Sequence, residues 1–85
     1  MINFTYTIKD KLGIHARPAG ILSKLAKKFE SEIYIEKGDK KALATRVIAI
    51  MGMGILHGDT ITVTVSGSDE EEASIAIKKY LSENL

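Results

Sequence analysis

Gly13-Ile14-His15-Ala16-Arg17-Pro18-Ala19-Gly20 is the stretch that organises the chain, because it joins an expected strand to an expected helix. Apolar and polar side chains alternate before it, at residues 2–9, and the helical period follows it, at residues 16–29. Pro18 supports a helix start here, since proline in the first turn breaks no intrahelical hydrogen bond. His15 is therefore expected directly before the first turn of a helix.

The residues around His15 form a candidate site for an anionic group. The first N–H groups of a helix have no partner inside it and carry a partial positive charge, which attracts anions. The same charge favours a neutral imidazole, which is a competent nucleophile. If His15 accepts a phosphoryl group, the N–H groups of Ala16 and Arg17 face its oxygens, and the planar guanidinium can hold two of them. The motif has no second base, carboxylate or histidine, so it suits passing a group on better than hydrolysis; a capping histidine beside a surface arginine is the alternative.

The stretch also resembles the active-site signature of HPr, the histidine-containing phosphocarrier of the bacterial sugar phosphotransferase system. The resemblance extends to chain length, segment order, Gly54 in the middle, and Gly67-x-Asp69-Glu70 before a final helix. It implies that Enzyme I, charged by phosphoenolpyruvate, phosphorylates His15 on Nδ1, and that His15 donates the group to IIA components of sugar permeases. The matching Arg17 is implied to contact the phosphoryl group. Such a protein is a carrier with a phosphohistidine intermediate rather than a turnover catalyst, and we expect no cofactor.

Composition fits one small globular domain spanning residues 1–85. Its 45% apolar and 27% charged residues suit one compact core with a charged surface. A net charge of +1 argues against bulk attraction to nucleic acid. The sequence has no cysteine, and His15 and His57 lack companions at metal-ligand spacing, so we expect neither disulfides nor a metal site. His57 is expected to be a turn residue without a function.

No segment predicts export or membrane insertion. The N-terminus lacks a basic region followed by a long apolar run, and the longest apolar run, residues 47–56, is too short to span a bilayer. The expected location is therefore the cytoplasm, and we expect a monomer.

Hydrophobic periodicity predicts an α+β fold with the element order βαββαβα. The expected strands are residues 2–9, 32–36, 41–44 and 60–66, and the expected helices are residues 16–29, 46–53 and a third that follows Ser68-x-x-Glu71. The last motif has the form of a capping box. This order favours an open-faced β-sandwich, a four-stranded antiparallel sheet with three helices on one face. The HPr-like topology of that sandwich is implied by the resemblance.

Two segments next to His15 are expected to contact partner proteins. One face of the first helix carries Arg17, further cations and an exposed isoleucine, which indicates a partner with acidic groups around an apolar contact. The segment 46–53 is apolar almost all round, and so small a protein cannot bury every side of a short helix. A solvated lysine face and a fully buried segment are the alternatives. The residues expected to bind partners are Gly20, Ile21, Lys24, Lys28, Arg46, Val47, Ile48 and Met51.

One position departs from the family pattern. Many HPr proteins carry a regulatory serine at the start of the short second helix, where this chain has Arg46. Arginine cannot accept phosphate from a serine/threonine kinase, so the kinase-dependent branch of regulation is expected to be absent. Arg46 is expected instead at the rim of the docking surface, where its charge can steer acidic partners. Thr45, the nearest hydroxyl, lies one residue out of register.

Other functions fit parts of the sequence. A regulatory docking module could keep the fold, but relatives that only regulate are expected to lose the active histidine. A ferredoxin-like RNA binder would need an aromatic pair on an alternating strand in a basic surround, and the sequence has none. An HPr-like paralogue in a nitrogen-related or otherwise specialised phosphorelay would keep every feature above, so that alternative stays open.

Overall fold

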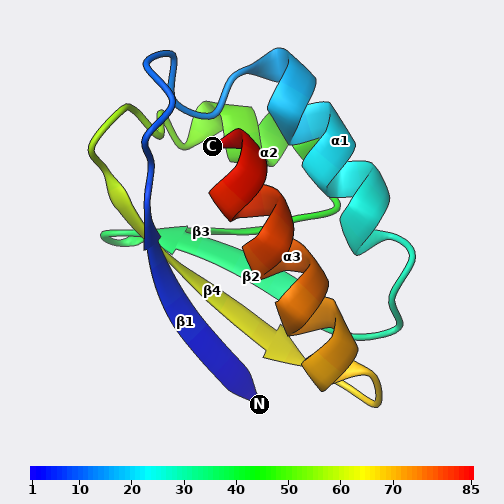
Figure 1. Cartoon of the computed structure of the whole chain (residues 1–85). Helices are drawn as coiled ribbons and strands as arrows, with labels where there is room; N and C mark the ends of the chain where they lie inside the picture. The colour runs from blue at the N-terminus through cyan, green and yellow to red at the C-terminus, as the bar shows by residue number, and fades with distance from the viewer.

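The computed structural model describes residues 1–85, which form a four-stranded antiparallel sheet and three helices. Its elements are β1 (Ile2–Thr7), α1 (Ala16–Ala26), β2 (Glu32–Lys37), β3 (Lys40–Leu43), α2 (Val47–Gly52), β4 (Thr60–Ser66) and α3 (Glu70–Asn84). The strands lie in the order β1-β4-β2-β3, and each neighbouring pair is antiparallel (Figure 1). The predicted α+β architecture and the element order βαββαβα are confirmed.

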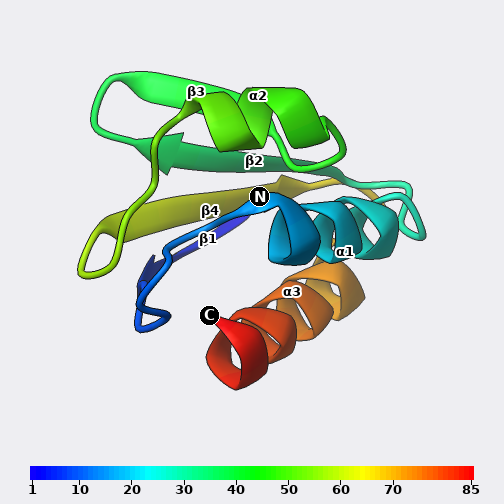
Figure 2. The ribbon, with the colours of Figure 1, turned by 90° about the horizontal axis from the view of Figure 1, so that it is seen from above.

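The three helices cover one face of the sheet and leave the other face open. α2 packs against β3, α3 packs against β1 and β4, and α1 lies between the two helices (Figure 2). The alternation of apolar and polar residues along β4 explains why the helices cover only one face. Ile61, Val63 and Val65 are buried under the helices, while the threonines between them face outward. A single core of 18 buried apolar residues fills the space between the layers. None of the helices is long and apolar enough to cross a membrane.

Two elements, β1 and α1, end two and three residues earlier than their sequence pattern predicts. β1 ends at Thr7, because the N–H groups of Lys9 and Asp10 turn away from the sheet. They donate to the carbonyl of Leu85, the residue that follows α3. α1 stops at Ala26 instead of Phe29. The last N–H groups there donate to carbonyls three residues back, which tightens the final turn and ends the helix.

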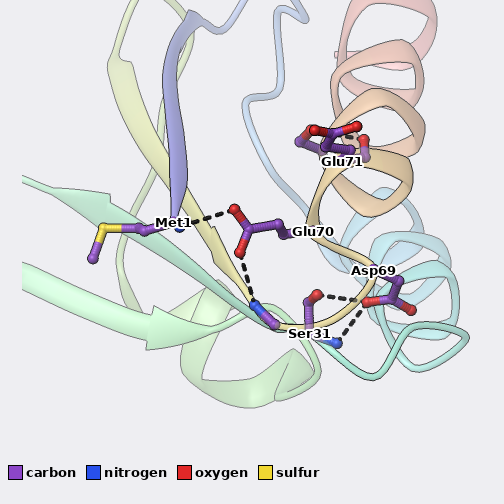
Figure 3. Close-up of polar contacts among 7 residues, drawn as sticks. Met1, Ser31, Asp69, Glu70 and Glu71 are labelled. Atoms are coloured by element: carbon purple, nitrogen blue, oxygen red, sulfur yellow. Dashed lines mark hydrogen bonds and ion pairs between the residues drawn. The ribbon is translucent and has the colours of Figure 1, made fainter.

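The predicted capping box at Ser68 is wrong. α3 begins at Glu70, and its N-cap, Asp69, makes no capping hydrogen bond. The Ser68 hydroxyl donates instead to Glu30 Oε2 at 3.1 Å. The Asp69 carboxylate accepts hydrogen bonds from the N–H groups of Glu30 and Ser31, both at 2.9 Å, and from the Ser31 hydroxyl (Figure 3). The Ser68 hydroxyl, which the box pattern assigns to α3, and the Asp69 carboxylate therefore hold the turn between α1 and β2.

Glu70 holds the same corner of the molecule. Its carboxylate accepts the Gly67 N–H at 3.2 Å and the Met1 amino group at 2.8 Å (Figure 3). Hydrogen bonds lower the pKa of both carboxyls, chiefly from the Ser31 hydroxyl for Asp69 and from the Met1 amino group for Glu70. Both side chains therefore favour the ionised form in the folded chain.

We expect Asp69→Asn to destabilise the protein at neutral pH and to remove part of its sensitivity to acid. A carboxyl whose pKa is lowered by folding stabilises the fold above its unfolded pKa of about 3.9, and the effect is lost as the pH falls through the folded value. Urea unfolding of both proteins, from neutral pH down to about pH 2, measures this difference. The two stabilities should converge at the acid end, and equal stabilities at neutral pH would contradict the role of Asp69.

Candidate functional site

His15 stands at the N-cap of α1 and makes no hydrogen bond through its ring. Its backbone is extended, with φ −111° and ψ −176°, and its side chain does not cap the helix. The His15 carbonyl accepts the first intrahelical hydrogen bond, from the Ala19 N–H at 3.0 Å. The N–H groups of Ala16 and Arg17 donate to no protein atom. The helix therefore leaves two donors free beside the imidazole.

An open pocket of about 260 Å³ lies against this helix start. It is lined by the loop before α1, the first turns of α1 and the last turns of α3. The lining residues are Asp10, His15, Arg17, Pro18, Ile21, Tyr80 and Asn84. Tyr80 ties the two helices together, because its hydroxyl donates to the Pro18 carbonyl at 3.3 Å, and burial raises the pKa of this phenol. Figure 1 shows the start of α1 and the end of α3 at the same end of the molecule.

Arg17 is exposed at the pocket, and none of the ion pairs in the structure involves it. Asp10 is the one carboxylate that lines the pocket, and its Oδ1 already accepts the Leu12 N–H at 2.8 Å. Asp10, Tyr80 and Asn84 were not predicted to line this site. An aspartate that accepts a hydrogen bond from the N–H two residues later is a recognisable turn signal, and it could have identified Asp10. No local sequence pattern predicts that the end of α3 lies next to the start of α1.

The arrangement offers a nucleophile, a fixed positive charge and two free amide donors to one anionic group. The charge-assisted donors of a helix start and an arginine are the groups that bind phosphoryl oxygens best. No second carboxylate lines the pocket to activate water, and no cluster of three or more His, Asp or Glu side chains could hold a metal ion. The pocket is equipped to bind an anionic group and to form a bond to it through the imidazole.

The loop before α1 sits on a second loop, residues 54–59, which we call the support loop. Gly13 has φ +68°, and a Cβ there would overlap the Ile55 carbonyl oxygen and lie 2.8 Å from the Leu56 Cα. The Ile14 N–H donates to the same Ile55 carbonyl at 3.0 Å. Only glycine fits such a close approach at positive φ. The backbone that leads into α1 therefore contacts the support loop directly.

The apolar residues predicted to bind partners lie on α1 and α2, which pack side by side. Ile48 is 82% exposed, Ile21 is 47% exposed and Met51 is 41% exposed. Val47 is half-buried and packs against the core. The expected exposure of part of the short helix is confirmed, because α2 has one inward side and buries only Ile50 fully.

The other predicted residues of this surface come from α1, the turn after it and the start of α2. Gly20 and Lys24 lie on α1, whereas Lys28 lies in the turn that follows the helix. Arg46 is the exposed N-cap of α2. It lines a concavity of about 560 Å³ together with Lys27 and the apolar start of α2. Arg46 therefore lies at the edge of the exposed apolar surface.

Two further exposed apolar side chains, Leu12 and Leu56, were not predicted. They are 69% and 62% exposed and come from the two loops that meet at Gly13. A leucine next to a turn glycine, as in Leu12-Gly13, is the local signal that could have marked the first of them.

The fold and the pocket together define an open-faced α+β sandwich that presents one unbonded histidine and one free arginine at the start of a helix. A family model described as "PTS HPr component phosphorylation site" matches residues 2–83. The chain therefore belongs to the HPr family, the phosphocarriers of the phosphotransferase system.

Relatives of known name cover nearly the whole chain. The phosphocarrier protein HPr of Mycoplasma genitalium is 45% identical over an alignment of 85 positions, which covers 99% of this chain and 97% of that protein. The HPr-like protein Crh of Halalkalibacterium halodurans is 38% identical over 81 residues, 95% of this chain and 96% of that protein. The chain is thus similar both to a carrier and to a protein named only as HPr-like.

Solved structures share the fold. HPr-C-His from Thermoanaerobacter tengcongensis superposes with a TM-score of 0.93 at 38% identity, covering 98% of this chain and 93% of that one. An HPr from Bacillus anthracis gives 0.87 at 36% identity, covering 94% and 95%. A structure described as an HPr dimer from T. tengcongensis gives 0.77 at 38% identity, covering 98% and 95%.

We expect Gly13→Ala to destabilise the protein more than Gly38→Ala. Both glycines have positive φ, +68° and +60°, but a Cβ at Gly38 meets nothing within 4 Å. Gly38→Ala should therefore cost about 1 kcal/mol from backbone strain alone, whereas the added overlap at Gly13 should bring the cost to about 2–4 kcal/mol. Urea unfolding of the two variants measures the difference. Equal losses would show that the two loops do not press together.

Proposed function

We propose that this chain is a phosphocarrier of the sugar phosphotransferase system that accepts a phosphoryl group on His15 from Enzyme I and passes it to IIA components. The observation that carries the proposal is the unbonded His15 ring beside two free N–H groups, in a chain of the HPr family. The second histidine is a weaker candidate. His57 lies in the support loop, where its Nδ1 is 3.2 Å from the Lys9 carbonyl oxygen.

The proposed transfer forms one bond and breaks one. The lone pair on His15 Nδ1 forms the bond to phosphorus, while the bond from phosphorus to the donor breaks and its electron pair leaves with the donor. The free N–H groups of Ala16 and Arg17 then donate to the phosphoryl oxygens, and the Arg17 guanidinium balances their charge. Transfer to a IIA component repeats the step with His15 as the leaving group. The one carboxylate that lines the pocket, Asp10, already accepts the Leu12 N–H, so we expect the phosphohistidine to persist until that acceptor arrives.

Donor and acceptor are proposed to use the same surface, formed by α1, the turn that follows it and the exposed side of α2. Its members are Gly20, Ile21, Lys24, Lys28, Arg46, Val47, Ile48 and Met51. Apolar side chains with cations around them suit partners whose contact surface is apolar with acidic groups at its rim. Because the partners bind in turn, each complex must be transient. We take the working form to be a free monomer in the cytoplasm.

Arg46 is proposed to keep this surface competent for transfer at all times. It stands where the family's regulatory serine would be, so the negative charge of a phosphoserine cannot be added there. A regulatory docking module is the second candidate function, since a Crh protein is among the relatives. The presence of His15 favours the carrier. A nitrogen-related or otherwise specialised relay would use the same site with other partners.

We expect His15 to be the only acceptor of the phosphoryl group. Incubation with Enzyme I and phosphoenolpyruvate should add the mass of one phosphoryl group to the wild type and to His57→Ala, and none to His15→Ala. Intact-mass spectrometry measures the gain, and circular dichroism checks that each variant folds. A phosphoryl gain in folded His15→Ala would refute the assignment.

We expect Ile48→Glu to weaken binding to both Enzyme I and a IIA component by roughly tenfold or more, because a charge would be buried in an apolar contact. Ile75→Glu is the matched control, since Ile75 is also largely exposed, at 69%, but lies on α3. Calorimetric titration of each variant with each partner measures the change. Unaltered affinity of Ile48→Glu for either partner would show that this partner docks elsewhere.

A further inference from the structure

We propose that Lys37, the last residue of β2, is a positioning residue for His15; this inference rests on the proposed transfer function. The Lys37 ammonium contacts both ends of the support loop. Its Nζ is 2.7 Å from Asp59 Oδ2 and donates to the Gly54 carbonyl at 2.9 Å. One side chain therefore closes the loop against which the backbone before α1 is packed.

Asp59 connects Lys37 to the interior of the support loop. Its Oδ2 also accepts the Leu56 N–H at 2.7 Å, and the Asp59 N–H donates back to the Leu56 carbonyl at 3.0 Å. The hydrogen bond from Lys37, followed by that from Leu56, lowers the pKa of Asp59, so the carboxylate stays charged for both donors. The turn from Leu56 to Asp59 is thus fixed from both sides.

The support loop contacts the segment before α1 at two places. At one end of that segment, Ile8 exchanges backbone hydrogen bonds with the loop: its N–H donates to the Asp59 carbonyl at 2.8 Å, and its carbonyl accepts the Gly58 N–H at 2.9 Å. At the other end are the Ile14 hydrogen bond and the close packing of Gly13 described above. A displaced support loop would therefore move Ile14 and, with it, His15, the next residue in the chain.

Lys37 does not line the pocket, so it can act on His15 only through this loop. Its pair with Asp59 is partly shielded, with exposures of 32% and 29%. The same hairpin has a looser pair, Lys41–Glu36, at 3.5 Å with exposures of 53% and 36%. Exposed pairs contribute little, so Lys41 gives a control that removes the same charge from the same hairpin.

The experiment compares Lys37→Met, Lys37→Arg and Lys41→Met in the full chain. Methionine keeps the aliphatic stem and removes the ammonium, whereas arginine can still reach both acceptors. We expect Lys37→Met to speed amide exchange at Ile14 by about fivefold or more relative to the β4 amides, since opening of this loop becomes easier. Transfer from Enzyme I should slow roughly threefold to tenfold, because small misplacements of a reacting group are costly. Lys37→Arg should restore both, and Lys41→Met should match the wild type.

Three results would overturn the proposal. The first is equal Ile14 exchange in Lys37→Met and Lys41→Met. The second is a rise at Ile14 that the β4 amides share, which would show only a loss of global stability. The third is faster Ile14 exchange with unchanged transfer, which would show that the loop does not position the ring. If the wild type itself takes no phosphoryl group, the proposed function fails, and the exchange comparison alone then decides whether Lys37 holds the backbone before His15.

Discussion

Backbone packing between Gly13 and the support loop determines where α1 begins. A main chain that lies this close to a carbonyl oxygen and a Cα atom leaves no space for a side chain, so the position requires glycine. This contact fixes the backbone between the end of β1 and the start of α1, and His15 lies in that segment. The pocket shared with the end of α3 and the exposed side of α2 are both placed relative to this junction. Residues distant in the chain can therefore affect the histidine without touching it.

The exposed apolar surface follows from the small size of the core. The 18 buried apolar residues are supplied mainly by the sheet and by the inner sides of α1 and α3, and the six-residue α2 adds only Ile50. Ile48 and Met51 of this helix face solvent while Val47 is half-buried, and an apolar surface of this kind with cations at its edge indicates contact with other proteins. A small contact area gives short-lived complexes. Short-lived complexes suit the proposed carrier function, in which the chain leaves one partner before it meets the next.

The sheet, the helix layer and the position of His15 were predictable because their signals are local. The alternation of apolar and polar residues predicted the ends of the strands to within two residues, and Pro18 predicted the start of α1. The capping box failed because the Ser68 hydroxyl and the Asp69 carboxylate bond instead to Glu30 and Ser31, which lie 38 residues away in the chain. The approach of Tyr80 to Pro18 and the pair of Lys37 with Asp59 also depend on which segments the sheet order brings together. Local patterns carry no information on such pairs.

The acidic residues at the start of α3 lie at the opposite end of the molecule from the start of α1 (Figure 1). The net charge of +1 therefore conceals a separation of charge along a body whose longest extent is 33 Å. Salt screens charges beyond about 8 Å at physiological ionic strength, so this acidic end adds almost nothing to the energy of a complex already formed at the histidine. Its effect comes earlier, as one pole of a molecular dipole. At low ionic strength, that dipole favours the approach of the proposed partners' acidic surfaces toward Arg17 and the imidazole over their approach toward the start of α3.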